Sequence, residues 1–392
     1  MMGLFNRNLV LLIICQGLFF TNNVTFIAIN GLVGMNLASS PLMATLPIMG
    51  YVVGGALSTA LVARAQSRYG RKKSFQSGLL VALVSSLLCA LAVYLGHFWL
   101  LVAATVLAGY YSANGQLYRF AAAELVEISV RDKAISWVLA GGLIGAIIGP
   151  NLARYTKDAA GYPFMGAYLA LGVLAVVAMI LMQFIRFPDD SRSQAPSDSG
   201  RDLGEIIRQP VFIVAALGAA FGYGIMNLLM AAAPLAMKVD GFEFADTATV
   251  LQWHVIGMFG PGFFTGALIR RYGVLQVMGA GTVLTFACIF IALHGVTFEH
   301  YLVSLFLLGV GWNFLFTGST SLATRSHTPE ERDKAQGAIN FAVFLMMALS
   351  SFSSGALVTT QGWYWLNIGS LVPAAAVAIA LMVLFVRQGR SR

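Results

Sequence analysis

The sequence predicts an all-helical membrane protein, built as two related six-helix bundles that follow each other along the chain. Only 10% of the 392 residues are charged, whereas a soluble domain has about 25%. Apolar runs approach the roughly 20 residues that a helix needs to cross a bilayer. Three motifs recur in the same order at offsets of 203, 202 and 201 residues: Arg68-Tyr69-Gly70 as Arg271-Tyr272-Gly273, Gly109-Tyr110 as Gly311-Trp312, and Arg131-Asp132-Lys133-Ala134 as Arg332-Asp333-Lys334-Ala335. A nearly constant offset indicates a duplicated unit.

The first half contains six apolar segments, and the charges between them mark where some of them end. A basic loop around Arg71 separates the second segment from the third, and Arg131 lies between the fourth and the fifth. Backbone groups in lipid must be paired internally, and the segments are too long for barrel strands, so each is expected to be a helix. The predicted transmembrane helices span residues 8–34, 41–63, 76–96, 99–124, 134–153 and 163–186.

The second half repeats this arrangement after a polar stretch that contains proline. Its predicted helices span residues 211–236, 247–269, 275–297, 300–324, 335–358 and 363–386. The stretch itself is rich in Asp, Ser, Pro and Arg, which is typical of a loop, so we interpret it as a cytoplasmic linker. The expected domains are an N-terminal bundle (1–186), the linker (187–209) and a C-terminal bundle (210–392).

Lys and Arg are distributed unevenly between the two sides of the predicted bundles. With the N-terminus in the cytoplasm, 20 of the 24 basic residues fall in cytoplasmic segments, and three (Arg154, Lys157 and Lys238) fall in outer loops. This asymmetry follows the positive-inside rule, so both termini are expected to be cytoplasmic. The net charge of +8 lies in short loops and forms no continuous stripe, so nucleic acid is not an expected partner.

No cofactor and no metal site are expected. Cys15, Cys89 and Cys288 lie within apolar runs and lack the spacing of metal ligands, so they are interpreted as small buried apolar side chains. The glycine-rich triplets Gly222-Tyr223-Gly224 and Gly309-Val310-Gly311 are not followed by a P-loop lysine, and the sequence contains no ATPase segment. Any transport would therefore be driven by a gradient.

Polar side chains gather in the middle of the first, fourth, seventh and tenth predicted helices. A polar group in the hydrocarbon core is costly unless it meets a partner or a wet cavity. Two interpretations therefore stay open for each asparagine, a cavity wall or a hydrogen bond between helices. Together, the Asn, Tyr and Trp side chains favour a neutral, amphipathic cavity for a modest-sized organic molecule. The candidate cavity residues are Asn22, Asn23, Tyr110, Asn114, Tyr118, Arg119, Tyr223, Asn227, Trp312, Asn313 and Thr317.

Arg119 lies inside a predicted helix, and three interpretations of it stay open. Its side chain reaches the membrane interface or backbone carbonyls, binds an anionic group of a solute, or pairs with a carboxylate such as Glu124. Glu124 is five residues further on and off the same helical face, which disfavours a direct pair. Proton coupling usually needs a titratable group inside the bundle, and His254 is either such a group or a packed histidine. The coupling candidates are Arg119, Glu124 and His254, with H⁺ as the expected ion.

The loop between the second and third predicted helices carries a family pattern. Residues 63–73 read Ala-Arg-Ala-Gln-Ser-Arg-Tyr-Gly-Arg-Lys-Lys. This resembles the G-x-x-x-D-[RK]-x-G-[RK]-[RK]-[RK] signature of the major facilitator superfamily, with Ala63 in place of Gly and Ser67 in place of Asp. The twelve spans, the 6+6 repeat and the polar linker extend the resemblance to the whole chain. It implies a secondary transporter of the bacterial inner membrane with the major facilitator fold, and we expect a functional monomer among membrane lipids. It also implies a cytoplasmic gate of Arg68, Gly70, Arg71, Glu124, Arg131, Arg271, Gly273 and Arg332.

Small residues are concentrated in helices that would face each other in that family fold, where the fifth faces the eighth and the second faces the eleventh. Close packing of helices in lipid uses small side chains. The expected interface residues are Gly145, Gly149, Pro150, Gly257, Gly260 and Gly266, and ordinary tight packing is the alternative. Residues 145–150 are also similar to the G-x-x-x-G-P core of a motif in the superfamily's antiporters.

The resulting prediction is a secondary transporter that moves a small amphipathic organic solute by alternating access. We expect proton coupling, and the antiporter-like motif favours export over uptake. Two other classes stay open, a membrane-embedded enzyme acting on a lipid-like substrate and a sensor that kept the fold. An enzyme would need His, Asp or Ser and Lys clustered at one depth, which the sequence does not show.

Overall fold

The computed structural model describes residues 6–127, 130–187, 200–328 and 331–390. Every regular element in these ranges is a helix, as predicted, and ten helical segments are long and apolar enough to cross a membrane. Residues 188–199 of the predicted linker lie outside the described ranges. Contacts divide the chain into unit 1 (1–193 with 242–252) and unit 2 (194–241 with 253–392).

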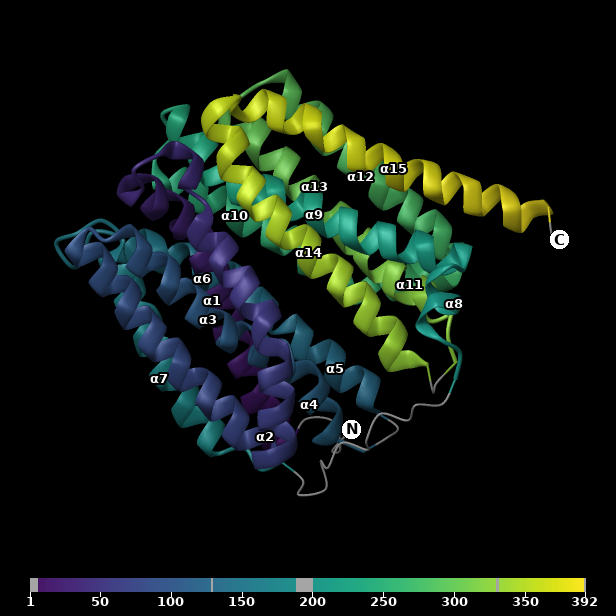
Figure 1. The fold of residues 1–392 in the computed structure, drawn as a ribbon, viewed down its shortest axis with the longest axis horizontal. Helices are drawn as coiled ribbons and strands as arrows, with labels where there is room; N and C mark the ends of the chain where they lie inside the picture. The colour runs from purple at the N-terminus through teal and green to yellow at the C-terminus, as the bar shows by residue number, and fades with distance from the viewer. Residues whose placement is uncertain (1–5, 128–129, 188–199, 329–330, 391–392) are drawn as a thin grey trace. The chain divides into compact units, whose positions relative to one another are not determined.

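Unit 1 contains the helices of the first half of the chain (Figure 1). α3 packs along α2, α6 packs against α1, and α7 packs against α2. The core of the unit includes the fully buried side chains of Phe19, Phe75, Leu79 and Tyr118. The elements are α1 (Arg7–Leu37), η1 (Pro41–Met43), α2 (Leu46–Leu95), α3 (Phe98–Gly115), α4 (Tyr118–Glu124), α5 (Arg131–Ala140), α6 (Gly142–Thr156) and α7 (Met165–Gln183).

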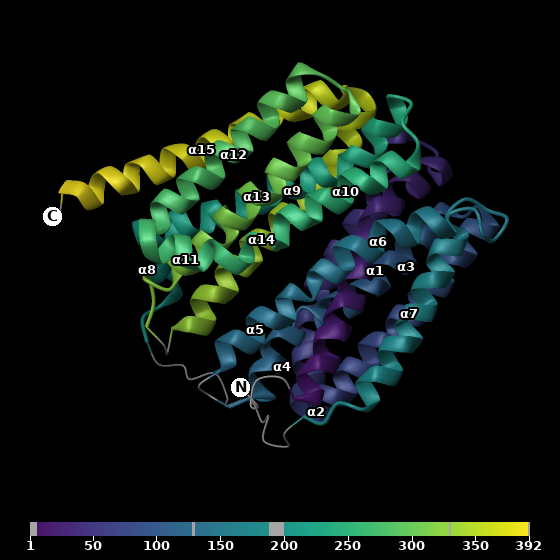
Figure 2. The same cartoon turned by 180° about the vertical axis from the view of Figure 1, so that it is seen from behind.

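Unit 2 contains most of the helices of the second half, which Figure 2 shows from behind. α9 contacts α13, α14 and α15, and α12 packs against α13. Helix α10 belongs to both units, because its residues up to 252 group with unit 1. The elements are α8 (Leu203–Ile207), α9 (Pro210–Val239), α10 (Phe244–Phe259), α11 (Gly262–Tyr272), α12 (Val274–His294), α13 (Phe298–Ala323), α14 (Arg332–Thr360) and α15 (Gly362–Arg390).

Three predicted transmembrane helices are interrupted, and the predicted count of twelve is not confirmed. The fifth divides into α5 and α6 at Gly141, although Trp137–Thr156 still forms one candidate span. The fourth predicted helix divides into α3 and α4, where the N–H of Leu117 bonds to the carbonyl of Asn114, a tight i+3 turn of 3.0 Å. The eighth divides into α10 and α11 at Gly260 and Pro261. Proline has no N–H to continue the ladder, and its ring clashes with the preceding turn. Apolar periodicity carries no information about any of these breaks.

The repeated Arg-Tyr-Gly motif forms the same backbone break in both units. Gly70 has φ 81° and ψ 165° and divides α2 into two membrane-length parts. Gly273, between α11 and α12, has φ 96° and ψ 153°. Glycine enters this region at little cost, whereas L side chains rarely adopt it. In each motif the arginine lies over the tyrosine ring, at 5.3 Å for Arg68 and 5.2 Å for Arg271.

Each unit contains a close crossing of two of its own helices, at equivalent positions of the repeat. A Cβ atom on Gly54 of α2 would lie 2.0 Å from the carbonyl oxygen of Val106 on α3. A Cβ on Gly257 of α10 would lie 2.7 Å from the carbonyl oxygen of Phe306 on α13. Gly54 and Gly257 are 203 residues apart, the same offset as the Arg-Tyr-Gly motif. Both crossings therefore depend on a glycine at the equivalent position.

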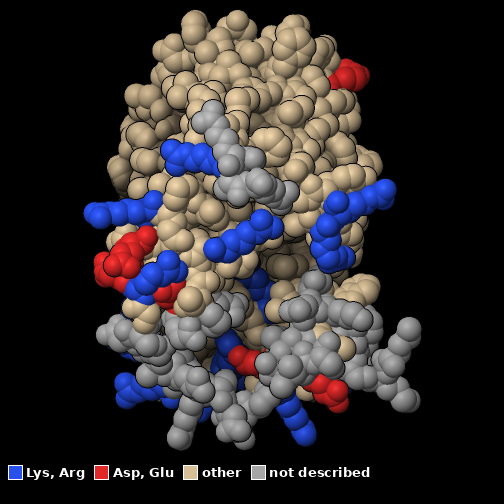
Figure 3. Space-filling view, turned by 90° about the vertical axis from the view of Figure 1, so that its right-hand side faces the viewer, with Lys and Arg blue, Asp and Glu red and all other residues tan. Residues whose placement is uncertain are grey.

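Large apolar side chains lie on the surface, as expected for helices that face lipid. Leu57, Phe263, Phe341 and Val372 are each more than half exposed. Exposed apolar area on this scale is unusual for a soluble monomer, but lipid is as apolar as these side chains. Figure 3 shows the Lys and Arg side chains of one face gathered below a broad area made mostly of uncharged residues. The described residues thus have the surface of a multi-pass membrane protein.

Candidate functional site

In unit 1, the predicted cavity residue Asn114 joins two helices. Its side chain is fully buried; Oδ1 accepts a hydrogen bond from Ser74 Oγ at 2.9 Å, and Nδ2 donates to the carbonyl of Tyr110 at 3.0 Å. Asn22 on α1 is also buried, but its Oδ1 has no hydrogen-bond partner among the described residues. Asn23 beside it is half-buried. Asn114 therefore has the geometry of the interhelical interpretation, whereas Asn22 keeps an unused acceptor.

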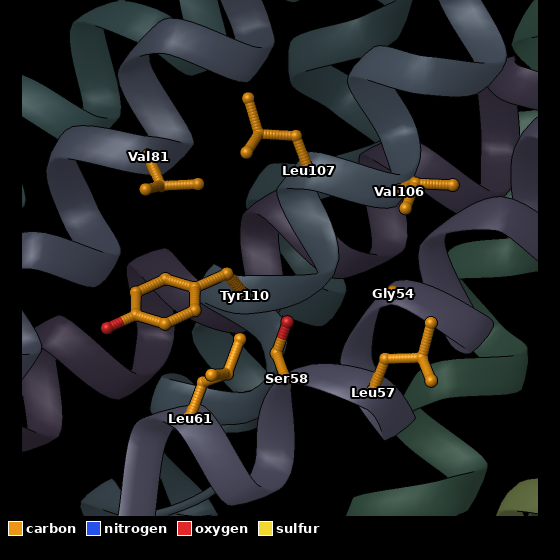
Figure 4. A pocket seen from close by; sticks show the side chains of 8 residues that line it. All are labelled: Gly54, Leu57, Ser58, Leu61, Val81, Val106, Leu107 and Tyr110. Atoms are coloured by element: carbon orange, nitrogen blue, oxygen red, sulfur yellow. The ribbon is translucent and has the colours of Figure 1, made fainter. Parts of the chain in front are cut away.

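Tyr110 lies on an apolar cavity of about 310 Å³ between α2 and α3 (Figure 4). Its hydroxyl is 3.1 Å from Ser77 Oγ, so the polar tip of the ring already has a partner. The lining is mostly apolar and the Tyr110 hydroxyl is already paired, so this cavity suits hydrocarbon better than a polar solute. The other lining residues are Gly54, Leu57, Ser58, Leu61, Val81, Val106 and Leu107.

Tyr118, another predicted cavity residue, lies in the core of unit 1. Its side chain is 0% exposed, and its ring centroid is 4.8 Å from that of Phe75 and 6.2 Å from that of Phe19. Arg119 follows it at the start of α4 and is half-buried, with its guanidinium carbon 4.8 Å from the centroid of the Phe120 ring. Tyr118 thus lies among buried aromatic rings, whereas the neighbouring Arg119 lies on a partly exposed face of α4.

In unit 2, two asparagines hold helices together. Asn227 on α9 donates through Nδ2 to Ser350 Oγ at 2.9 Å and Ser351 Oγ at 2.8 Å, both on α14. Asn313 on α13 accepts from Thr265 Oγ1 at 2.7 Å and donates to the carbonyl of Met258 at 2.7 Å. Asn227 thus ties α9 to α14. Asn313 ties α13 to both pieces of the interrupted α10–α11 helix.

On the same helices as these two asparagines and on α10 lies an aromatic cluster, defined here as Tyr223, Phe259, Trp312 and Phe316. Trp312 and Phe316 are one turn apart on α13 and stack with centroids 5.1 Å apart at an angle of 10°. Tyr223 on α9 presents its ring edge-on to both, at 5.3 and 5.6 Å, and Phe259 lies 6.2 Å from Trp312. Trp312 is 7% exposed and the other three are half-buried. The next residue after Phe316, the predicted Thr317, is also half-buried.

The indole nitrogen of Trp312 has no hydrogen-bond partner among the described residues. An indole N–H can only donate, and a buried donor without an acceptor loses the hydrogen bond that water would give. The predicted cavity residues of unit 2 therefore include one unused donor within an aromatic surface. Of this cluster, the sequence pointed to Tyr223 and Trp312. Phe259 and Phe316 were missed because phenylalanine in an apolar run carries no polar signal.

His254, the predicted proton site, is fully buried on α10. Its Nδ1 lies 2.6 Å from the carbonyl oxygen of Leu305 on α13. A carbonyl only accepts, so Nδ1 carries the hydrogen and Nε2 of the neutral ring is left as an acceptor. Nε2 has no partner within the described part of the chain. The ring therefore ties α10 to α13, and a single nitrogen stays available to a proton.

The predicted gate residues of unit 1 contain an ion pair. Arg71, just after the Gly70 break, donates through Nε to Glu124 Oε2 at 2.6 Å and through Nη2 to Oε1, and through Nη1 to Gln66 at 2.7 Å. Both members are partly buried, at 17% and 28% exposure. Arg68 and Arg271 instead lie over their neighbouring tyrosines. The side chains of Arg131 and Arg332 lie outside what the structure describes.

Unit 2 has an ion pair that the sequence did not indicate. Arg201 donates through Nε to Glu331 Oε1 at 2.8 Å and through Nη2 to Oε2 at 2.7 Å, and the N–H groups of Arg201 and Thr328 also donate to this carboxylate. The Glu331 side chain is 2% exposed. The Arg201 guanidinium, with the two backbone donors, holds the pKa of Glu331 well below its ordinary value. The residues are 130 apart, and sequence spacing gives no hint that they meet.

The glycines predicted at the interface between bundles make contacts within their own units. A Cβ on Gly145 would lie 2.5 Å from Phe20 Cβ of α1, and the Gly149 carbonyl accepts from Thr25 Oγ1 at 3.0 Å. Pro150 follows within α6. In unit 2, Gly257 is at the crossing described above, Gly260 precedes the break, and a Cβ on Gly266 would have only Arg270 Nη1 nearby, at 4.0 Å. Packing within each unit accounts for Gly145, Gly149 and Gly257.

Comparison with known proteins decides the class of this protein. The sequence profile of the Major Facilitator Superfamily matches residues 10–351 and 255–392. This chain belongs to the major facilitator superfamily. It is a multi-pass membrane protein and a secondary transporter, and not an enzyme.

The relatives of this major facilitator protein include one with a named solute. The riboflavin transporter RfnT of Brucella anthropi is 37% identical over 380 residues, which cover 96% of this chain and 95% of the relative. The uncharacterized MFS-type transporter YddS of Bacillus subtilis is 24% identical, over 88% of this chain and 83% of the relative. A mutant of the nucleoside transporter NupG superposes with a TM-score of 0.79, covering 97% of this chain and 100% of that chain at 13% identity. At that identity, the likeness to NupG concerns the fold alone.

Proposed function

We propose that this major facilitator protein transports riboflavin or a closely similar flavin. The observation that carries the proposal is the 37% identity to a riboflavin transporter over nearly the full length of both chains. Transport would proceed by alternating access, with the bundles 1–186 and 210–392 moving about the linker 187–209. The protein would act as a monomer in the cytoplasmic membrane with both termini in the cytoplasm, because the basic residues follow the positive-inside rule.

The chemistry of the polar residues supports a solute of this class. Riboflavin is neutral, with a flat ring system, hydrogen-bonding groups on the ring edge and a polyhydroxyl chain. Within unit 2, an unused donor on Trp312 and exposed aromatic surface on Tyr223 and Phe316 match these features. None of these groups carries a charge, which favours a neutral solute over a bare ion.

For coupling, we propose exchange of the flavin for protons, with export as the direction. The glycine-proline motif at 145–150 supports this direction by its similarity to antiporters. Among the coupling candidates, Glu124 is held by Arg71, whereas His254 keeps one ring nitrogen unpaired among the described residues. We therefore propose His254 as the proton site, because its Nε2 is the acceptor that no described residue binds. A flux that does not change with pH in the wild-type protein would contradict proton coupling.

The experiment that tests the function is counterflow of labelled riboflavin in proteoliposomes that contain the purified protein. Liposomes preloaded with unlabelled riboflavin should accumulate the label transiently, and an imposed pH gradient should change the rate in opposite senses when its direction is reversed. Protein-free liposomes are the control. No accumulation above that control, with protein that is folded and inserted, would contradict riboflavin as the solute.

Arg119 provides a second test of the transport cycle. We propose a role for it in transport, because it is a half-buried charge at the start of a short helix beside the α3–α4 break. We expect Arg119→Ala to lower riboflavin flux about 10-fold or more, since a lost charge-assisted contact is worth about 1.5–3 kcal/mol. Arg154→Ala, at a predicted outer loop, is the matched control. Normal flux at normal expression would exclude Arg119 from the mechanism.

A further inference from the structure

We propose that the aromatic cluster of unit 2 binds the flat ring of the solute and that the Trp312 indole N–H donates a hydrogen bond to an acceptor on the ring edge. The proposal deepens the proposed function, because flavins are the solute class on which it rests. It assigns the ring-binding surface to one unit and identifies the donor. It also specifies the chemistry required, a planar heteroaromatic ring with a carbonyl or ring nitrogen at its rim.

The unused donor is the first observation that points to a ligand. Trp312 is more than nine-tenths buried, and its Nε1 lacks a partner among the described residues. The other polar side chains around the cluster are already paired: Asn227 with Ser350 and Ser351, and Asn313 with Thr265. These amides position the helices, so the indole N–H is the donor that an incoming acceptor can satisfy.

The surface around this donor has the shape that a flat ring needs. Trp312 and Phe316 are nearly parallel, at 10°, and Tyr223 stands at 86° to the indole and 77° to Phe316. A ligand ring placed beside them could stack parallel to Trp312 and Phe316 and meet Tyr223 edge to face. Aromatic pairs prefer such offset-stacked and edge-to-face arrangements. The exposed parts of Tyr223 and Phe316 are available to extend both contacts to a third ring.

Phe259 contacts the indole of Trp312 edge-on, with centroids 6.2 Å apart at 71°, and lies next to a helix break. It is the last residue of α10, and the helix is interrupted at Gly260 and Pro261 immediately after it. A proline lacks the N–H that would tie the next turn to α10, so the backbone after Phe259 has one restraint fewer. The Phe259 ring is half-buried and is therefore placed to move aside as a solute ring reaches the N–H of Trp312.

The geometry excludes several other solute classes. An aliphatic sugar has no π system for aromatic stacking and could offer only its C–H face, and a small anion would find no charged partner among the four aromatic side chains. A plain hydrocarbon ring would stack but leave the indole donor unpaired, which costs the hydrogen bond again. The isoalloxazine ring satisfies both demands, because it is flat and carries carbonyl oxygens and ring nitrogens on its edge.

The test is equilibrium binding of riboflavin and of lumiflavin, the same ring without the ribityl chain, followed by quenching of flavin fluorescence. The full-length purified protein is compared with Trp312→Phe, Phe316→Leu and the control Trp365→Phe, which changes an exposed tryptophan of the same unit. Trp312→Phe keeps the ring and removes the donor, so both flavins should bind about 2- to 10-fold more weakly. Phe316→Leu should weaken both by about 5- to 100-fold through lost stacking. Loss of the indole should also make the remaining quenching smaller at saturation, which a merely structural defect would not do.

Each outcome decides the proposal. Equal affinities and quenching in Trp312→Phe and Trp365→Phe would overturn it, and so would a wild-type protein that binds neither flavin. If Trp312→Phe is poorly folded by its melting temperature, Phe316→Leu decides alone. If both flavins bind with the expected losses but riboflavin is not transported, the ring site stands and the proposed function fails. If riboflavin is transported while both variants bind normally, the proposed function stands and the ring site fails.

Discussion

Tyr110 and Trp312 occupy equivalent positions in the two units, yet their polar groups have different surroundings. They are 202 residues apart, and each follows a glycine. The Tyr110 hydroxyl is paired with Ser77 beside an apolar cavity, whereas the Trp312 N–H is unpaired among the described residues and lies within a half-exposed aromatic cluster. The two units thus share a framework and differ in the chemistry that it carries. The difference points to unit 2 as the side that recognises the solute ring.

The ion pairs of the two units show the same contrast. In unit 1, Arg71 and Glu124 join the end of the α2 break to α4, and both side chains remain partly exposed. In unit 2, the described residues form no such ion pair at the equivalent break at Gly273, and Arg201 instead binds the buried carboxylate of Glu331. The ion pair of unit 2 therefore holds the end of the predicted linker, in which Arg201 lies, whereas the ion pair of unit 1 lies at its own helix break.

The largest expected effect tests the framework that both units share. Gly54→Val should prevent correct folding, because its Cβ would lie 2.0 Å from the Val106 carbonyl and neither helix can move away cheaply. Gly257→Val, with 2.7 Å to the Phe306 carbonyl, should fold with a lower melting temperature. Overpacking costs about 1–3 kcal/mol even where side chains adjust. The yield of monodisperse protein and the melting temperature measure both.

The control for these two variants is Gly369→Val, where an added Cβ meets nothing within 4 Å. It should behave like the wild-type protein. If Gly54→Val folds as well as Gly369→Val, the close crossing is not a requirement of unit 1.

The next effect separates the two ion pairs. Glu331→Gln should lower the melting temperature by several degrees, and more than Glu124→Gln does, because Glu331 is 2% exposed and Glu124 is 28% exposed. The pKa of Glu331 is lowered in the folded state. Its stabilising contribution is therefore present above the unfolded pKa of about 4.3 and is lost as the pH falls below it.

Melting curves of the wild type and Glu331→Gln, taken from neutral pH down to about pH 3, measure this contribution, because it is lost below the unfolded pKa. The gap between the two proteins should narrow toward the acid end. Two outcomes would contradict a larger contribution from the Arg201–Glu331 ion pair. One is a difference in melting temperature that stays constant over this pH range, and the other is a larger decrease in melting temperature in Glu124→Gln.

A smaller effect is expected at the repeated backbone break. Gly70→Ala and Gly273→Ala each force a side chain into a positive-φ conformation, which costs about 1–3 kcal/mol. Gly273→Ala should cost slightly more, because its Cβ would lie 2.5 Å from Gln276 Oε1, whereas a Cβ on Gly70 meets nothing within 4 Å. Chemical unfolding of Gly273→Ala with and without Gln276→Ala isolates that difference. If the second change leaves the cost of Gly273→Ala unaltered, the contact with Gln276 is irrelevant.

The smallest effect concerns the comparison between Tyr110 and Trp312 directly. Ser77→Ala removes the hydrogen-bond partner of the Tyr110 hydroxyl and makes Tyr110 resemble Trp312 in having an unpaired group. It should cost about 0.5–1.5 kcal/mol. Combining it with Tyr110→Phe should restore part of that loss, because the unpaired hydroxyl is then absent. Full additivity of the two changes in unfolding experiments would show that the pair contributes nothing.

Much of the fold follows from the sequence, because apolar length and repeated motifs report directly on helices in lipid. The helix-rich class, the membrane location and the break at Arg-Tyr-Gly could all be predicted in this way. The division of the fourth and eighth predicted helices could not, since the turn after Asn114 depends on local backbone pairing and the one at Pro261 on how much strain the packing tolerates. Hydropathy is averaged over a window of residues, so it does not detect these local interruptions of a helix.

The site residues were predictable by type and depth, but not by partner. Asparagine in an apolar helix signals that a partner or a cavity is needed, and it does not say which. The structure gives Asn114, Asn227 and Asn313 helix partners, whereas Trp312 is left with an unused donor. Phe316 and Glu331 escaped notice because their importance depends on which side chains the fold brings beside them.

The measurement that tests the account most directly is riboflavin counterflow in proteoliposomes containing Trp312→Leu or Tyr110→Leu. Both changes replace an aromatic ring at the equivalent repeat position, so they act as controls for each other. Tyr110→Leu should keep counterflow within about 3-fold of the wild type, and Trp312→Leu should lower it at least about 10-fold, since it loses both stacking and the hydrogen bond. Equal rates in the two variants would contradict the assignment of ring recognition to unit 2.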